Sequence, residues 1–187
     1  MSEMELLARE AAAKHGLDPA LICALCEVES GWETRAIRQE VGYTYLYGLA
    51  AGETGVIACI QGAAGEQLHT LLKEIQSTIA TEVVMQKTSW GLMQIMGAVA
   101  RERGFRGWLT ELCDPTVNLE WGCRHLRWML DHPLDYGLSI AQGPAVLKGT
   151  LADLAAAWNG GKARFVDGKY TNQSYVDRVV AAMVNYE

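Results

Sequence analysis

Residues 18–32 read DPALICALCEVESGW, and this stretch decides the fold because it predicts one buried helix. Asp18 is a favourable N-cap residue, and Pro19 is favourable at the first helical position. Apolar residues recur through the stretch at helical spacing. Gly31 is a plausible end, since glycine is the residue most often found just past a helix.

Glu29 continues the apolar stripe of this predicted helix. Ile22, Cys26 and Glu29 recur at i, i+4 and i+7, whereas Glu27 lies about 200° away around the axis and should face water. A carboxylate in the last turn meets the negative end of the helix dipole, and an apolar setting also disfavours its charged form. We therefore expect a raised pKa for Glu29, which suits a general acid. The alternative is a partly exposed glutamate at a frayed helix end.

Composition places the chain among ordinary globular proteins. Of its 187 residues, 50% are hydrophobic and 20% are charged, and no apolar run approaches the roughly 20 residues that span a bilayer. The net charge is −6 and no basic stripe is present, so nucleic acid is not an expected partner. The five cysteines have no metal-ligand spacing, and we expect them to be reduced, with no metal and no cofactor.

Helical periodicity covers most of the remaining chain, and at most a minor β element is expected. The helices predicted by periodicity and end signals cover residues 3–15, 18–32, 65–87, 89–104, 116–130, 151–158 and 174–184. Residues 132–149 are expected to be mostly loop. Residues 33–64 allow two interpretations, a hairpin with its turn at 52–55 or a loop with helical turns.

Five blocks then resemble, in order, the lytic transglycosylases related to goose-type lysozyme. The blocks are Glu29-Ser30, Gly91-Leu92-Met93-Gln94-Ile95-Met96, Asp114-Pro115 with Asn118-Leu119, Gly122 and Leu126, Ala156-Ala157-Trp158-Asn159-Gly160-Gly161, and Tyr175-Val176-Asp177-Arg178-Val179. The resemblance implies a mainly α, lysozyme-like single catalytic domain over residues 1–187, with an elaborated segment at 33–88. It also implies cleavage of the β-1,4 bond between N-acetylmuramic acid and N-acetylglucosamine in peptidoglycan.

The same resemblance implies roles for individual residues. Glu29 would be the general acid. Six further residues would contact substrate: Ser30, Met93, Gln94, Trp158, Asn159 and Tyr175. Five of them have a structural alternative, which is a helix cap for Ser30 and Asn159 and core packing for Met93, Trp158 and Tyr175. Trp158 departs from the family, which usually has tyrosine there.

The fate of the cleaved sugar is a separate question. A transglycosylase needs one acid, whereas a hydrolase must orient a water, usually with a second carboxylate. The long segment after the predicted Glu29 helix supplies Glu33, Glu40 and Glu53, and Glu40 is the best placed of the three. The sequence therefore favours a hydrolytic muramidase with Glu40 as its second carboxylate. Lytic transglycosylation is the alternative, and a non-catalytic murein-binding module is a weaker one.

Partners and location follow from the same features. We expect a monomer that acts on peptidoglycan strands. The basic and aromatic residues at 120–132 allow contact with a membrane or with lipopolysaccharide, although a core helix with a solvated edge is favoured. Residues 1–16 lack the features of a signal peptide. This fits a phage or prophage endolysin made in the host cytoplasm that reaches the cell wall after the inner membrane opens.

Overall fold

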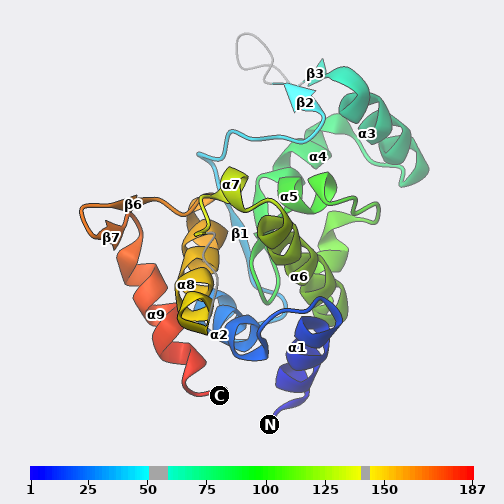
Figure 1. Cartoon of the computed structure of the whole chain (residues 1–187). Helices are drawn as coiled ribbons and strands as arrows, with labels where there is room; N and C mark the ends of the chain where they lie inside the picture. The colour runs from blue at the N-terminus through cyan, green and yellow to red at the C-terminus, as the bar shows by residue number, and fades with distance from the viewer. Residues whose placement is uncertain (51–58, 140–143) are drawn as a thin grey trace. The chain divides into compact units, whose positions relative to one another are not determined.

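The computed structural model describes residues 1–50, 59–139 and 144–187, and these are mainly helical, as predicted (Figure 1). They divide into two compact units. Unit 1 comprises residues 1–32 with 122–187, and unit 2 comprises residues 33–121. The prediction of a single domain over 1–187 stays a prediction.

Unit 1 is built around α2 (Pro19–Ser30), which packs against α1 (Glu3–Lys14) and α9 (Gln173–Met183). The Asp18 carboxylate accepts hydrogen bonds from the first free N–H groups of α2, and Gly31 ends the helix in the left-handed conformation. The predicted start, end and buried stripe of this helix are therefore confirmed. Seven consecutive residues of α2, Ala20 to Cys26, are buried, which makes it the core element of the unit.

The rest of unit 1 completes the cover around α2. In Figure 1, α8 (Pro144–Gly160) runs beside α9, and a hairpin of β6 (Phe165–Val166) and β7 (Lys169–Tyr170) joins the two helices. The long helix α6 (Pro115–Asp131) enters this unit at Gly122, and α7 (Pro133–Tyr136) follows it.

Unit 2 combines short strands and helices. β1 (Ile37–Gln39), β4 (Thr88–Trp90) and β5 (Ile95–Met96) form an antiparallel sheet in the order β1-β4-β5, with Ile37 opposite Trp90. A second pair joins β2 (Leu49–Ala50) to β3 (Cys59–Ile60). The helices of this unit are α3 (Gly62–Glu74), α4 (Ile79–Gln86), α5 (Gly97–Glu102), a 3-10 helix at Leu109–Cys113 and the first turns of α6.

The predicted single helix over 65–87 is wrong, because α3 and α4 are separate helices. Gln76 has a positive φ of 55°, which no α-helix accommodates, and the side chain of Thr78 caps the new helix by accepting from Thr81 N–H. The aliphatic side chains of the two helices lie in one cluster made of Leu49, Leu68, Leu71 and Leu72, with Leu46, Ile60, Ile75, Ile79 and Val83 around them.

The helix predicted over 89–104 is also wrong in its first half. β4 and β5 occupy residues 88–96 with a tight turn between them, and the helical part is only α5. Gly91 and Gln94 have φ values of 65° and 51°, so the backbone reverses here instead of coiling. The helical spacing of Leu92, Ile95 and Met96 marks a buried turn and strand, not a helix.

Two further segments differ in part from the secondary structure predicted for them. Residues 132–149 contain α7 and the start of α8, so they are less loop-like than predicted. In residues 33–64, Leu49 and Ile60 lie opposite each other in two antiparallel strands, as the hairpin interpretation predicts. The predicted turn at 52–55 lies outside the described residues. β1, β6 and β7 were not predicted.

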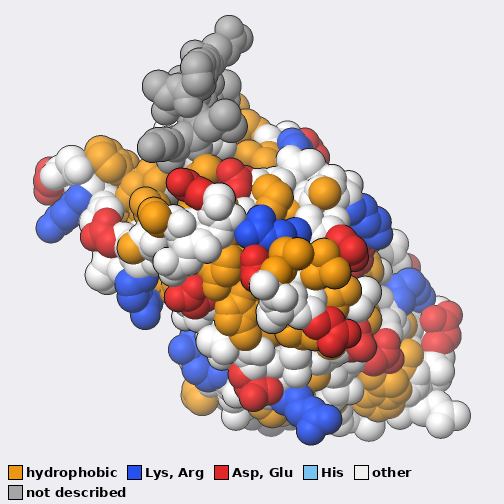
Figure 2. Space-filling model, turned by 90° about the horizontal axis from the view of Figure 1, so that it is seen from below, with side chains coloured by type: hydrophobic (Ala, Val, Ile, Leu, Met, Phe, Trp, Pro, Cys, Tyr) orange, Lys and Arg blue, Asp and Glu red, His pale blue; other side chains and the backbone are white. Residues whose placement is uncertain are grey.

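No helix in the described part of the chain is both long and apolar enough to cross a membrane. On the face drawn in Figure 2, Lys and Arg side chains are interspersed with Asp and Glu, and among the described side chains neither sign forms a continuous stripe.

Candidate active site

Glu29 lies in the last turn of α2, half-buried, as the apolar stripe predicts. Its carboxylate oxygen Oε1 accepts a hydrogen bond of 2.6 Å from the hydroxyl of Tyr175, in the first turn of α9. A hydroxyl that donates to a carboxylate stabilises the ionised form. Burial and the helix dipole disfavour the ionised form of Glu29, so they act against the hydrogen bond from Tyr175.

Tyr175 is only 5% exposed, so it is not an open stacking platform for a sugar. Burial, the Glu29 charge and the hydrogen bond to Glu29 together raise the pKa of Tyr175 well above its ordinary value. The hydroxyl therefore stays protonated and remains a donor over the whole working range of pH. Trp158 has no hydroxyl group, and in unit 1 it is Tyr175 that supplies the hydroxyl contact to Glu29.

We expect this tyrosine to weaken the protein at high pH. Above about pH 10 the unfolded chain releases the Tyr175 proton while the folded chain keeps it. The folded state then binds more protons, so the free energy of unfolding falls as pH rises, by up to about 1.4 kcal/mol per pH unit for this one group. Urea titrations between about pH 9 and 11 should show a shallower decline for Tyr175→Phe than for wild type. Parallel declines would contradict the buried, bonded hydroxyl.

The end of α2 is held by a second tyrosine. Tyr186 donates a hydrogen bond of 2.6 Å to Glu27 Oε2 and accepts one of 3.1 Å from Trp32 Nε1. Glu27 is half-buried and bonded to a residue 159 positions away in the chain, so the prediction that it faces water holds only in part. Ser30 takes its helix-capping alternative, since its hydroxyl donates to the Cys26 carbonyl at 3.0 Å.

Trp158 and Asn159 lie at the end of α8. The Trp158 ring is half-buried and lies 5.8 Å from the ring of His125, whereas Asn159 is exposed. Asn159 Oδ1 accepts a hydrogen bond of 3.0 Å from Asn172 Nδ2, which also donates to the Ala156 carbonyl at 3.1 Å. Asn172 thus fixes the end of α8 just before α9. Sequence reasoning did not single it out, because a lone asparagine before a helix gives no signal beyond a cap.

Met93 and Gln94 lie in the tight turn between β4 and β5 of unit 2, and their contact with substrate stays a prediction. Met93 is 0% exposed and so packs in the core. The Gln94 amide donates to the carbonyls of Ala36 and Gly91, both at 2.9 Å, and accepts from Ser89 Oγ at 2.9 Å. These partners engage both ends of the Gln94 amide, so its role in this structure is to hold the turn.

Asn118, on α6, braces the same turn from the other side. Its side chain accepts from Met93 N–H at 2.8 Å and donates to the carbonyls of Trp90 and Leu112 at 2.7 and 2.8 Å. It is fully buried. Asn118 and the Gly-Leu-Met-Gln residues belong to separate sequence blocks, and the structure shows one network that builds a single turn from both.

Gly91 sits at the tightest point of this turn, so Gly91→Ala should destabilise unit 2. A Cβ atom there would lie 2.3 Å from the Leu112 carbonyl oxygen and 2.4 Å from Asn118 Nδ2, at a φ of +65°. We expect a loss of at least about 2 kcal/mol in the free energy of unfolding, measured by urea titration. Gly16→Ala is the matched control, because Gly16 has a φ of +62° and open space around it. Its loss of stability therefore measures the backbone strain without the steric clash. Equal losses would show that the packing around Gly91 is not tight.

Glu40, the predicted second carboxylate, lies just after β1 and is partly exposed. Its Oε1 forms an ion pair of 2.5 Å with Arg38 Nε, and its backbone N–H donates to the Lys87 carbonyl. Glu33 Oε1 accepts from the Arg35 backbone N–H, and Glu53 lies outside the described residues.

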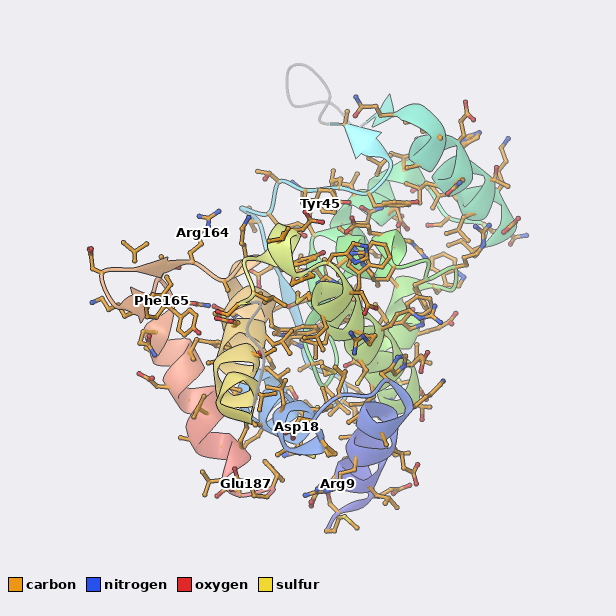
Figure 3. All side chains as sticks on the ribbon, in the orientation of Figure 1. Arg9, Asp18, Tyr45, Arg164, Phe165 and Glu187 are labelled. Atoms are coloured by element: carbon orange, nitrogen blue, oxygen red, sulfur yellow. The ribbon has the colours of Figure 1, made fainter. Side chains whose placement is uncertain are left out.

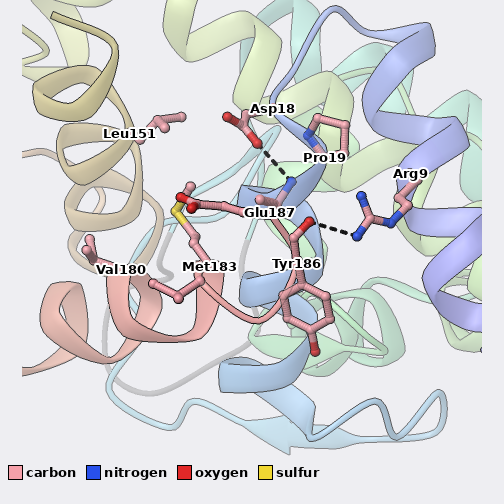
Figure 4. Close-up of a pocket in the computed structure, with 10 residues that line it drawn as sticks. Arg9, Asp18, Pro19, Leu151, Val180, Met183, Tyr186 and Glu187 are labelled. Carbon is pink, nitrogen blue, oxygen red and sulfur yellow. Dashed lines mark hydrogen bonds between the residues drawn. The ribbon is translucent and has the colours of Figure 1, made fainter. Parts of the chain in front are cut away.

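Unit 1 also contains a groove of about 610 Å³ (Figure 4). Two of its polar side chains, those of Arg9 and Asp18, maintain the fold. Arg9 donates to the Tyr186 carbonyl at 2.8 Å, and Asp18 caps α2. The remaining wall is mostly aliphatic, with Leu151, Val180 and Met183. No acid in this lining is placed like Glu29, so the groove is not the candidate active site.

The possible metal-ligating side chains and the cysteine thiols of the described residues can be considered in turn. Within residues 1–50, 59–139 and 144–187, no three His, Cys, Asp or Glu side chains are grouped to hold a metal ion. Among the described residues, Cys23, Cys26 and Cys113 have free thiols. Burial raises the pKa of the Cys23 thiol to about 11 and raises the pKa of the Cys26 thiol well above its ordinary value, so neither is a nucleophile near neutral pH.

Residues 6–178 match the family described as the transglycosylase SLT domain. No curated protein matches the chain.

Proposed function

The chain belongs to the transglycosylase SLT domain family, and from this premise we propose that Glu29 is the general acid with which it cleaves the glycan strands of peptidoglycan. The bond cleaved is the β-1,4 linkage between N-acetylmuramic acid and N-acetylglucosamine. The observation that carries the assignment is the place of Glu29, half-buried in the last turn of α2 and hydrogen-bonded to Tyr175.

Cleavage of this bond requires a proton on the leaving oxygen as the bond breaks. Glu29 is suited to give that proton, because its helix end disfavours charge on it. The hydroxyl of Tyr175 stabilises the carboxylate once the proton has left. Glu29 and Tyr175 therefore form a pair that can both release and take back a proton. Because α2 and α9 pack together and carry one member each, the pair is held rigidly.

Two reactions can follow this protonation. In hydrolysis, which the sequence favours, a second carboxylate orients a water that attacks the sugar. In transglycosylation, the 6-hydroxyl of the muramic acid attacks its own C1 while Glu29 takes up the proton, and a 1,6-anhydro sugar results with no water consumed. We propose transglycosylation. It needs only Glu29, whereas Glu40, the candidate for orienting a water, has one carboxylate oxygen engaged by Arg38.

Mass spectrometry of digested, purified cell-wall sacculi separates the two reactions. We expect fragments that end in anhydro-muramic acid, which are lighter by one water than fragments with reducing ends. Glu40→Gln should change neither the rate nor the product. Reducing ends that disappear in Glu40→Gln would instead assign hydrolysis with Glu40 as the second carboxylate. An intact glycan after prolonged incubation would favour a non-catalytic murein-binding module.

A further inference from the structure

The hairpin at residues 162–170 presents a small cationic surface that the cleavage reaction does not use. Lys162, Arg164 and Lys169 are all exposed, and the hairpin carries a single acid, Asp167. Within residues 1–50, 59–139 and 144–187, none of these three cations forms an ion pair. This local positive charge stands out in a chain whose net charge is −6.

Two exposed apolar side chains lie among these cations. Phe165 is 64% exposed and Val166 is 54% exposed. Figure 3 labels Arg164 and Phe165 and draws them on opposite sides of the hairpin ribbon. The Phe165 ring meets the ring of Tyr170 edge to face, with 5.1 Å between centroids, and this contact holds its orientation.

The base of the hairpin is anchored firmly to unit 1. The Tyr170 hydroxyl donates to Asp153 Oδ1 at 2.6 Å, and Thr171 N–H donates to the Arg164 carbonyl at 2.9 Å. Asp167 and Gly168, with φ values of 50° and 81°, form the two-residue turn that matches the twist of paired strands. The exposed cations and Phe165 therefore project from a hairpin whose backbone is held in place.

A short stretch of chain joins this hairpin to the residue that contacts the proposed acid. Asn172, two residues after β7, is bonded to Asn159 at 3.0 Å. Three residues further on, Tyr175 is bonded to Glu29 at 2.6 Å. The hairpin therefore leads into the same end of α9 that carries the Glu29 partner.

We propose that residues 162–170 form a binding site for the acidic stem peptide that peptidoglycan carries on its muramic acid. This inference rests on the proposed function, and it names a second part of the same substrate. Stem peptides carry free carboxylates, which complement the cations Lys162, Arg164 and Lys169, and alkyl groups, which complement Phe165 and Val166. A lipid surface is the weaker choice, because two apolar residues, one of them packed against Tyr170, give little area to insert.

The test compares soluble glycan strands that keep their stem peptides with the same strands stripped of peptide by an amidase. Wild type should have the lower KM on the peptide-bearing strands. A triple variant, Lys162→Gln with Arg164→Gln and Lys169→Gln, should raise that KM about tenfold, leave kcat unchanged and leave cleavage of stripped strands unchanged. Added salt should weaken the wild-type preference, because exposed charges are screened.

Two controls make the result specific. Lys73→Gln with Arg106→Gln and Arg127→Gln removes the same amount of charge from positions outside the hairpin, two of them exposed and Arg127 partly exposed, and should leave the KM near wild type. The conservative set Lys162→Arg, Arg164→Lys and Lys169→Arg should keep the preference for peptide-bearing strands.

Four outcomes would overturn the proposal. The first is a triple glutamine variant that keeps the wild-type preference. The second is the same variant losing only its binding to vesicles of anionic phospholipid, which would assign the hairpin to a lipid surface. The third is wild type cleaving neither kind of strand, which would remove the proposed function as well. Cleavage without a peptide preference would refute the peptide site alone.

Discussion

Glu29→Gln should lower the rate of glycan cleavage by at least about 100-fold, because a positioned general acid contributes about 10² to 10⁴ to such reactions. Glutamine keeps the size of the side chain and still accepts a hydrogen bond from Tyr175, so the fold should persist. The measurement is the initial loss of turbidity of purified sacculi, with circular dichroism as the check on folding. A folded variant that keeps more than about a tenth of the wild-type rate would remove Glu29 from the catalytic role.

The chain contains a matched control for this experiment. Glu27 lies on the same helix, is also half-buried, and also accepts a 2.6 Å hydrogen bond from a tyrosine, Tyr186. Glu27→Gln therefore reproduces the structural disturbance without touching the proposed acid. We expect it to keep most of the wild-type rate. Equal losses in the two variants would show that the effect of Glu29→Gln is structural.

Arg101→Met should destabilise unit 2 by about 3–5 kcal/mol, because it leaves the buried carboxylate of Glu82 without its countercharge. The two side chains are 1% and 0% exposed, and the Nε–Oε1 distance is 2.7 Å. Arg101 also donates to the carbonyls of Phe105 and Gly107, which would lose their partner. The measurement is the free energy of unfolding by urea titration.

The double variant Glu82→Leu with Arg101→Met is the comparison for this prediction. It removes both charges, so the penalty for an unpaired buried carboxylate disappears. We expect it to be more stable than Arg101→Met alone. If the two variants were equally unstable, the loss of stability would come from lost packing and not from the unpaired Glu82 carboxylate.

The sequence predicted the helices best where a regular apolar stripe met a strong end signal. α2 shows this, because Asp18, Pro19 and Gly31 mark its ends and its stripe contains Glu29. The spacing of that stripe was enough to indicate the proposed acid. Periodicity failed at residues 65–96, where Gln76 and Gln94 adopt positive φ values. Glutamine is not a residue that indicates a positive φ, so the apolar residues spaced three and four apart were interpreted as a continuous helix.

Partners far apart in the chain were the other feature that the sequence did not reveal. Tyr175 is 146 residues from Glu29, and Tyr186 is 159 residues from Glu27. Nothing in local spacing pairs them, because the pairing depends on how α9 packs against α2. The buried pair of Glu82 and Arg101 was missed for the same reason, since a charged residue on a helix is expected on its solvated face. Met93 and Gln94 were recognised as a block, but their structural role emerged only with the turn.

The most direct test of the central claim uses peptide-free glycan strands of known length, resolved by chromatography after incubation with wild type or Glu29→Gln. These strands contain no peptide bond, so only cleavage between sugars can shorten them. Cleavage through Glu29 predicts that wild type shifts the distribution to short chains while Glu29→Gln leaves it unchanged. An unchanged distribution with wild type, or equal shortening by both proteins, would contradict it.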